Sequence, residues 1–305
     1  MTFTAFFLIL SSIILHSSWH FLCKSSGKSS MAFFALFSTS LFFTMLPLAL
    51  SSGLLFKLPA DVLKFAFWGA VSGSVCNVGL MLAYKYSDIS LAYPTARALP
   101  VFFTLLATSL FGWGKPLSFA AAAGMLIIFA GCVLMAFTNN PGAKTRSQRI
   151  SALKKGLIGI LIGAFGTTGY TIIDSFGIKE IMAFAPDENK FLVTSAYSCV
   201  RETTAATLMW ICVWIRHTQG KDKGVLRELA VTFRPYLAGV FAGLAYALVL
   251  LAMNYVTNVS FVQAFRQLSL PFSAFLGYFF LKEKISPART VSIILIMAGL
   301  MLCLL

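Results

Sequence analysis

Charged residues are scarce in this sequence. Asp, Glu, Lys and Arg make up 11% of its 305 residues, whereas a soluble domain carries roughly 25%. So few charges cannot cover a water-exposed surface, which excludes an ordinary soluble protein. Hydrophobic residues take their place, at 58% of the chain with a mean hydropathy of +0.84. The 30 Phe residues fit helices that face lipid.

Acidic residues are fewer than basic ones, with 10 Asp and Glu against 24 Lys and Arg and a formal net charge of +14. In a soluble protein this excess would suggest nucleic-acid binding, but charge is the only criterion met and no motif accompanies it. The basic residues lie mainly in short gaps between apolar runs, as in loops that face anionic lipid and the cytoplasm. We therefore expect membrane lipid, and no nucleic acid, as a partner.

Signatures of nucleotide, metal and cofactor chemistry are missing. The sequence has no G-x-x-x-x-G-K-[ST] loop and no close Cys-x-x-Cys pair. His16 and His20 have the spacing of metal ligands, but a zinc protease needs Glu directly after the first His, where Ser17 stands. We therefore expect no cofactor, no metal site and no catalytic residues. The cysteines are interpreted as buried free thiols: Cys23, Cys76, Cys132, Cys199, Cys212 and Cys303.

Long apolar runs fill the chain. A membrane-spanning helix needs about 20 mostly apolar residues, and the stretches that qualify are 3–23, 31–52, 62–84, 89–111, 117–137, 156–178, 190–215, 235–255, 259–280 and 288–305. They predict an all-α integral membrane protein of ten transmembrane helices, a multi-pass protein of the cell (inner or plasma) membrane. No basic segment precedes the first stretch and no small-residue cleavage site follows it. We therefore interpret it as a membrane helix and not as a cleaved signal.

The predicted helices fall into two halves of five. Residues 138–155 contain an Asn-Pro-Gly turn and five basic residues, and we interpret them as a linker loop between the repeats 1–137 and 156–305. The two halves align by eye, with Arg97 falling 169 residues before Arg266. Because each repeat has an odd number of helices, the second must enter the membrane from the opposite side, which makes the repeats inverted.

Basic residues are distributed unevenly between the two ends of the predicted helices. Sixteen Lys and Arg lie on the side away from the N-terminus, and five lie on the same side as the N-terminus. The positive-inside rule places the more basic side in the cytoplasm. We therefore expect the 138–155 linker to be inside and both termini outside.

Several ionisable side chains lie inside the predicted helices, where a charge costs about 2.5–3.5 kcal/mol on insertion scales. They are Arg97, Arg201, Arg266, Asp174, Glu202, His16 and His20. We take this set as the candidate substrate-binding site. With neutral histidines it carries a net charge of +1, which favours a substrate with a carboxylate or phosph(on)ate, because such groups fit the planar fork of Arg.

Arg97 and Arg266 stand at corresponding depths of two helices that contain proline. Pro94 and Pro100 flank Arg97, and neither Arg has an acidic residue within one helical turn. Pro271 follows Arg266. Proline removes a backbone donor, so we expect both helices to be interrupted. Matching interrupted helices point to the binding site of a transporter; the alternatives are a structural ion pair and snorkelling to the interface.

Two further helices carry an aromatic and a polar residue on one face. His16, Trp19 and His20 share a face of the first helix, and Tyr170 and Asp174 share one of the sixth. Because His titrates near neutral pH, we expect the two histidines to affect the pH dependence of activity. The alternatives are hydrogen bonds that pack helices together and, for the aspartate, a place at the membrane interface.

Arg201 and Glu202 are neighbours in the seventh helix. Successive residues diverge by about 100° around a helix, so we expect each to find a partner on another helix and not to pair with the other. Lone polar side chains in a bundle more often join helices than bind ligands. Weaker candidates of this kind are Tyr93, Gln263, Asn77 and Tyr246.

The sequence resembles the drug/metabolite transporter superfamily, EamA type, over nearly its whole length. Leu281-Lys-Glu-Lys-Ile-Ser286 is similar to a Leu-Gly-Glu-x-x-Ser turn of the family's second repeat, whereas Gly112-Trp-Gly-Lys-Pro116 in the first half lacks the Glu. His16-Ser-Ser-Trp-His20 and Tyr170-Thr-Ile-Ile-Asp174 resemble motifs of one branch, in which Asn is usual at the last position of the first motif. The best-known members are taken to have both termini in the cytoplasm, opposite to the charge count.

The resemblance implies a secondary transporter that works by alternating access. Together with the charged set, it predicts a small polar metabolite with an anionic group as the substrate, and coupling to protons or to exchange. One alternative is a lipid-carrier flippase subunit, which requires a lateral opening and a lipid-phosphate site. Another is a polytopic membrane enzyme, which requires a converging nucleophile, acid or metal set. A homodimer is left open.

Overall fold

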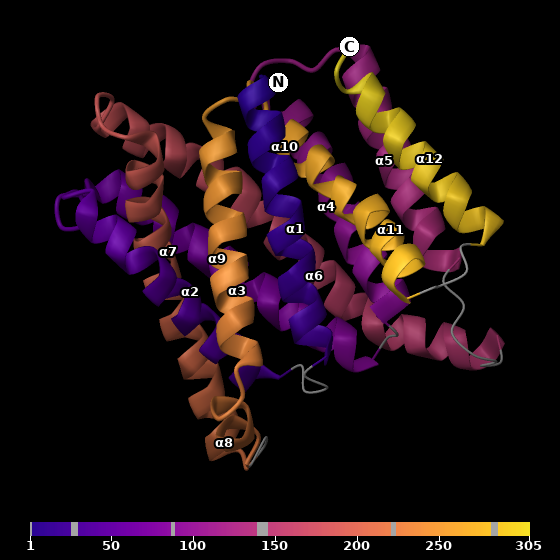
Figure 1. Cartoon of the computed structure of the whole chain (residues 1–305), viewed down its shortest axis with the longest axis horizontal. Helices are drawn as coiled ribbons and strands as arrows, with labels where there is room; N and C mark the ends of the chain where they lie inside the picture. The colour runs from indigo at the N-terminus through magenta and orange to yellow at the C-terminus, as the bar shows by residue number, and fades with distance from the viewer. Residues whose placement is uncertain (1, 26–29, 87–88, 139–145, 221–223, 282–285) are drawn as a thin grey trace.

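The structure is a computed structural model that describes residues 2–25, 30–86, 89–138, 146–220, 224–281 and 286–305. In these ranges every regular element is a helix (Figure 1). They are α1 Phe3–Ser25, α2 Met31–Ser51, α3 Ala60–Tyr86, α4 Ile89–Phe111, α5 Phe119–Thr138, α6 Arg146–Phe184, α7 Lys190–Thr218, α8 Val225–Ala230, α9 Arg234–Met253, α10 Val259–Phe265, the 3-10 helix η1 Arg266–Leu268, α11 Ser269–Leu281 and α12 Pro287–Leu302.

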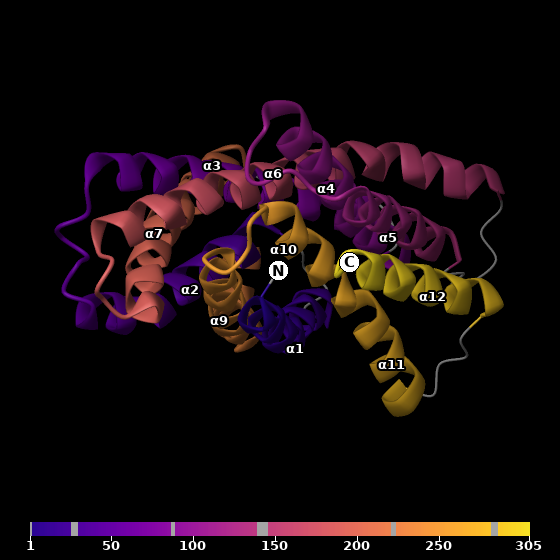
Figure 2. The same ribbon diagram turned by 90° about the horizontal axis from the view of Figure 1, so that it is seen from above.

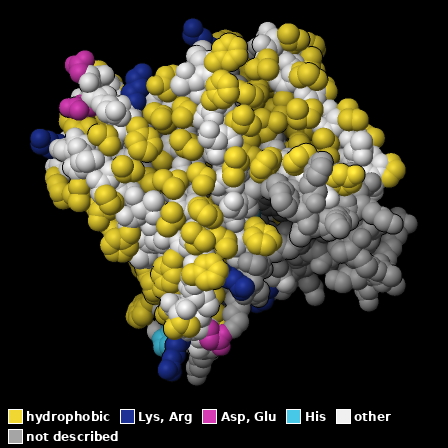
Figure 3. All heavy atoms as spheres, viewed as in Figure 1, with side chains coloured by type: hydrophobic (Ala, Val, Ile, Leu, Met, Phe, Trp, Pro, Cys, Tyr) yellow, Lys and Arg dark blue, Asp and Glu magenta, His cyan; other side chains and the backbone are white. Residues whose placement is uncertain are grey.

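The helices have the length and composition of membrane spans. Among the described residues, six helices are long and apolar enough to cross a membrane, namely α1, α2, α3, α4, α6 and α9. α5 and α12 are apolar but shorter. Apolar side chains are spread widely over the face seen in Figure 3, and Phe56 and Phe119 are each 90% exposed. Large apolar patches of this kind are unfavourable in water but stable against lipid, so the prediction of an all-α membrane protein is confirmed.

Each predicted stretch coincides with a helix or, for the ninth, with a run of three helices, but some bounds differ. α6 begins at Arg146, so residues 146–155 of the expected linker are helical, while residues 139–145 lie outside the described part. Residues such as Arg, Gln, Ala, Leu and Lys, which fill this segment, have high helix propensity. Apolarity therefore marks where a helix enters the membrane and not where it begins. The short α8, which was not predicted, lies in the second basic stretch.

The prediction of interrupted helices is confirmed in the second half and wrong in the first. α10, η1 and α11 follow one another where a single span was expected, and Pro271 has no N–H to bond the carbonyl of Gln267. α4, by contrast, continues through Pro94 and Pro100. Neighbouring helices can satisfy backbone groups that proline frees inside a membrane, so proline alone does not decide where a helix breaks.

Small residues let the helices approach closely where they pack. α3 packs along α6, and a Cβ added to Gly79 would lie 2.2 Å from the backbone nitrogen of Gly163. α5 packs along α12, and a Cβ added to Gly124 would lie 2.5 Å from the carbonyl oxygen of Gly299. Because lipid provides no hydrophobic drive for helices to associate, close contact between small residues holds such pairs together.

The helices form two layers with the candidate site between them. Figure 2 shows α3, α6 and α4 along one side of the molecule, and α2, α9, α1 and α11 along the other. α7 lies at one end of these layers and α12 at the other. His16 of α1, Tyr170 of α6 and Arg201 of α7 line a shared cavity.

Candidate functional site

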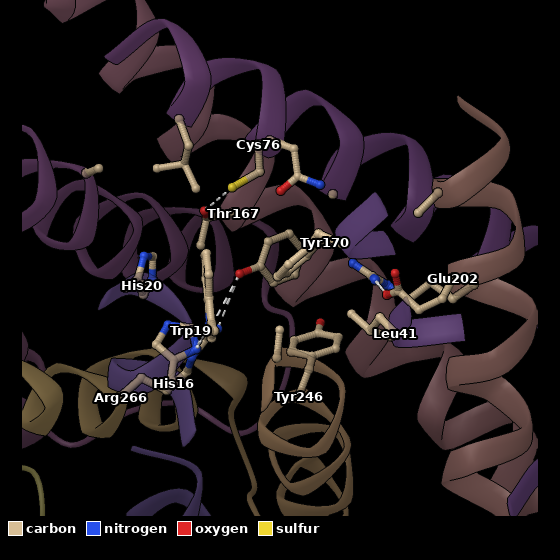
Figure 4. Close-up of a pocket in the computed structure, with 18 of the residues that line it drawn as sticks. His16, Trp19, His20, Leu41, Cys76, Thr167, Tyr170, Glu202, Tyr246 and Arg266 are labelled. Carbon is tan, nitrogen blue, oxygen red and sulfur yellow. Dashed lines mark hydrogen bonds and ion pairs between the residues drawn. The ribbon is translucent and has the colours of Figure 1, made fainter. Parts of the chain in front are cut away.

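A cavity of about 120 Å³ lies between the two layers (Figure 4), which is room for several water molecules. Its walls come from α1, α2, α3, α4, α6, α7, α9, α10 and η1. Most of the candidate residues line it, namely His16, Trp19, His20, Asn77, Arg97, Tyr170, Arg201, Glu202, Tyr246, Gln263 and Arg266. The fold thus brings together side chains that are far apart in sequence, and their part in substrate binding stays a prediction.

Two candidates are not among the described side chains that line the cavity. Asp174 is fully buried and does not line the cavity, but it bonds the side chain of Arg201, which does. Asp174 therefore lies inside the helix bundle. The side chain of Tyr93 lies outside the described part of the structure.

Arg97 on α4 forms hydrogen bonds to the interrupted helix made of α10, η1 and α11. Its Nη2 donates to the carbonyl oxygen of Arg266 at 2.6 Å and to the hydroxyl of Ser269 at 2.5 Å. Arg266 is the first residue of η1 and Ser269 is the first residue of α11. Hydrogen bonds from a charged donor are stronger than neutral ones, so Arg97 holds the break in a fixed geometry.

His16 lies between two groups that can only donate. Trp19 Nε1 donates to His16 Nδ1 at 3.0 Å, and Arg97 Nη1 lies 2.6 Å from His16 Nε2. A neutral imidazole has one acceptor nitrogen and a protonated one has none. The surroundings of His16 therefore oppose its protonation. His20 stacks on Trp19, with ring centroids 3.5 Å apart.

Arg266 is held loosely. It is 4% exposed, and Figure 4 shows it beside the Tyr170 hydroxyl. Its Nη1 and Nη2 each lie 3.5 Å from that hydroxyl, and Nη1 lies 3.4 Å from Gln263 Oε1. Hydrogen bonds of N–H to O are shorter at their optimum, about 2.9–3.0 Å. Among the described residues no carboxylate contacts Arg266.

Arg201 is held tightly on the other side of the cavity. Its Nε donates to Asp174 Oδ2 at 2.8 Å, and its Nη1 contacts Glu202 Oε1. Our expectation that Arg201 and Glu202 would not pair is therefore wrong: the long Arg side chain bends back to its neighbour. The expectation of a partner on another helix is confirmed for Arg201, by Asp174 on α6.

Asp174 accepts two more hydrogen bonds from tyrosines. Tyr197 Oη donates to its Oδ1 at 2.8 Å, and Tyr246 Oη donates to its Oδ2 at 2.5 Å. The carboxylate thus receives one charged and two neutral donors in a fully buried position. A buried charge is stable only when it is paired and hydrogen-bonded in this way.

Two tyrosine rings separate the two groups of charges. The Tyr246 ring centre lies 4.8 Å from Arg201 Cζ and 6.0 Å from Arg266 Cζ. The Tyr170 ring packs edge-on against it, at 5.5 Å between centroids. Cations favour the faces of such rings, so the tyrosines hold the arginines apart without neutralising them.

The match to known families covers the part of the chain that supplies Arg201, Glu202 and Arg266 to this wall. Residues 154–305 match the family model described as the EamA-like transporter family. The second half of the chain belongs to the EamA-like transporter family. The recognition made from the sequence motifs is thereby confirmed, and at the family level the protein is a transporter and not an enzyme.

The likeness to a known fold extends over nearly the whole chain. A solved structure, described only as a crystal structure of a protein, superposes with a TM-score of 0.70 over 99% of this chain and 96% of its own. The two sequences are 17% identical, so the likeness concerns the fold alone. Among curated proteins, no relative matches the sequence.

The cavity combines the EamA-matching half with the rest of the chain. Arg201, Glu202 and Arg266 lie in the matching half, whereas His16 and Arg97 come from the first half. Both halves are therefore needed to close the wall around the cavity.

Gly69, Gly73 and Tyr197 are among the residues of the site that were missed from the sequence. A Cβ added to Gly69 would lie 2.0 Å from Asp174 Oδ1, and one added to Gly73 would lie 2.8 Å from Arg201 Nη2. Their spacing of four residues, typical of closely packed membrane helices, was an available signal. Tyr197 could have been found because it precedes Arg201 by four residues and so shares its helix face.

Proposed function

We propose that the protein is a secondary transporter that carries a small polar metabolite with an anionic group across the cell (inner or plasma) membrane. The EamA-like match supports transport in general. The cavity, which lies between two layers of helices, supplies a place for the metabolite. The proposal that the metabolite is anionic rests on the surroundings of the Arg266 side chain.

Arg266 is a buried cation whose contacts are weak. A charge inside the membrane costs several kcal/mol unless a partner offsets it, yet its neighbours are a hydroxyl and an amide oxygen at 3.4–3.5 Å. Its guanidinium faces the cavity and retains donors for a further acceptor. A carboxylate or phosph(on)ate that accepts two parallel N–H bonds supplies the missing charge and geometry.

The packing of the helices supports two inverted repeats of five helices, 1–137 and 156–305. Exchanging the repeats turns the α3–α6 pair into the α9–α1 pair, and both pairs pack closely. The α2–α7 and α5–α12 pairs each map onto themselves, and both are also present. Such a pseudo-two-fold arrangement is typical of transporters in which one repeat rocks against the other. Alternating access around the central cavity is the mechanism that fits this symmetry.

Transport requires a driving force, and the sequence has no nucleotide-binding loop. We therefore propose coupling to protons or to exchange with a second solute. The lipid-carrier alternative requires a basic lateral opening. The groove between α2 and α7 is lined by threonines and apolar side chains such as Thr39, Phe43 and Trp210, with no cation among its lining residues.

A binding screen tests the class of substrate. The purified protein is heated with sets of small metabolites that are matched in size and differ in charge, and the melting temperature is measured. We expect anionic and zwitterionic compounds to raise the melting temperature of the wild type and to lose this effect in Arg266→Gln. Stabilisation by cationic compounds only, or by anions equally in both proteins, contradicts the proposal.

A further inference from the structure

Two buried carboxylates share one cation at the edge of the cavity. Asp174, Arg201 and Glu202 are 0%, 5% and 3% exposed, and Arg201 contacts both acids. Among the described residues no second cation contacts either acid. The cluster therefore carries one negative charge in excess when both acids are ionised. An uncompensated buried charge is expensive, and acids in such sites take up a proton instead.

The hydrogen bonds single out Glu202 as the acid that takes the proton. Asp174 receives donors from Arg201, Tyr197 and Tyr246, and such bonds favour the ionised form of a carboxylate. Within the described part of the chain, Glu202 receives one hydrogen-bond contact, from Arg201 Nη1. Protonating Glu202 therefore disturbs fewer hydrogen bonds than protonating Asp174.

Access to water also distinguishes the two acids. Glu202 and Arg201 line the cavity, whereas Asp174 lies behind them. Water that enters the cavity can therefore deliver a proton to Glu202 and remove it again. Asp174 is enclosed by its donors and by Gly69, where even a Cβ would collide with its oxygen.

Charged and titratable groups face Glu202 from the surrounding helices. α7 itself contributes Arg201, Tyr197 and Cys199; α6 contributes Asp174 and Tyr170; α9 contributes Tyr246; and α3 contributes Cys76, while α2 has no titratable residue. Across the cavity lie Arg97, Arg266, His16 and His20. By Coulomb's law the negative charge of Asp174 favours a proton on Glu202, whereas the positive charge of Arg201, and from further away those of Arg97 and Arg266, oppose it.

We propose that Glu202 is the proton-binding site of the protein and that its proton is linked electrostatically to the anion at Arg266. An anion at Arg266 cancels part of the positive field that opposes protonation of Glu202, so the anion promotes binding of the proton. Linkage is reciprocal, so the proton promotes binding of the anion by the same factor. Anion and proton then cross together in one direction. The coupling rests on the proposed anion site, whereas the proton site stands on the cluster alone.

Infrared difference spectroscopy of the purified protein tests the proton site without any substrate. A pH titration of the wild type is expected to show the C=O band of a neutral carboxylic acid, and Glu202→Gln is expected to lose it. Glu188→Gln, which changes an exposed glutamate in the α6–α7 turn, serves as the matched control and keeps the band. A band that persists in Glu202→Gln overturns the proposal.

A labelling experiment keeps the test decisive if Glu202→Gln does not fold. Wild-type protein carrying ¹³C in its glutamate carboxyl groups must show a shifted band, and protein labelled at aspartate must not. A band that moves with aspartate labelling assigns the proton to Asp174 and overturns the assignment to Glu202.

The linkage is tested by removing the positive charge across the cavity. Arg266→Gln imitates neutralisation by an anion, so the Glu202 band is expected to titrate at higher pH than in the wild type. Arg266→Lys keeps the charge and is expected to leave the titration in place. An identical titration in all three proteins overturns the linkage. Because no transport is measured, a failure of the proposed transport function has no effect on these outcomes.

Discussion

The two cavity arginines, which occupy corresponding positions in the sequence repeats, have different surroundings, and this difference makes a sharp prediction. Arg97 bonds the Arg266 carbonyl and the Ser269 hydroxyl at 2.6 and 2.5 Å. Among the described residues, the hydrogen-bond contacts of the Arg266 guanidinium are 3.4–3.5 Å long. Replacing each by Lys keeps the charge and removes the fork. The two variants should therefore fail in different assays.

For Arg266→Lys we expect a loss of affinity with little loss of stability. The fork's second bond to an anionic substrate is charge-assisted and worth roughly 1.5–3 kcal/mol, which is about 10- to 150-fold in the dissociation constant. The bonds lost within the protein are long and weak, so the free energy of unfolding should fall by less than about 1 kcal/mol.

For Arg97→Lys we expect the reverse. A single ammonium group cannot reach His16 and the Ser269 side together, so at least one charge-assisted bond is lost, at a cost of roughly 1.5–3 kcal/mol of stability. Its effect on affinity should be indirect, through the position of Arg266.

Calorimetric binding of an anionic metabolite that stabilises the wild type, and melting temperatures of the same purified samples, separate these outcomes. If Arg266→Lys binds as tightly as the wild type and melts several degrees lower, Arg266 is a structural residue and the reasoning is refuted.

Three further predictions concern other parts of the molecule. Gly69→Ala should destabilise the protein by about 3 kcal/mol or more, because its Cβ displaces the Asp174 carboxylate; Gly163→Ala, where the nearest atom is 3.6 Å away, should melt close to the wild type, and equal melting of both variants contradicts this. His16→Gln should lower transport without changing its pH profile, because the ring lies between two donors; an altered profile restores our original expectation for the histidines. Ser147→Cys in a cysteine-free protein should resist a membrane-impermeant maleimide in intact cells, because the basic linker is expected in the cytoplasm; strong labelling reverses the orientation.

The positions of the membrane helices could be predicted from the sequence, because the length of an apolar run alone determines where such a helix lies. A run of about 20 apolar residues has few other stable states in a membrane, so stretches such as 31–52 were located within a few residues. The predicted helix bounds were wrong where a helix includes polar residues, as at Arg146, where α6 begins before its apolar stretch. The break at η1 followed from Pro271, but the same rule failed for Pro100 because tertiary contacts decide whether a freed carbonyl is tolerated.

The members of the site were predictable, and their partners were not. Ionisable residues inside apolar stretches are visible in any sequence, and most of them do line the cavity. The bond from Arg201 to Asp174 depends on the way α6 and α7 pack, and the bond to Glu202 depends on a side-chain conformation. Gly69 has no side chain to attract notice, and its role appears only once Asp174 lies against it.

Uptake by proteoliposomes tests the central claim, that an anionic metabolite crosses the membrane through the cavity at Arg266. Radiolabelled metabolite is added outside vesicles that are loaded with the same unlabelled compound, and its entry is followed with wild type, with Arg266→Gln and without protein. We predict saturable entry with the wild type and none above the protein-free level with Arg266→Gln. Equal entry with wild type and Arg266→Gln would contradict the account.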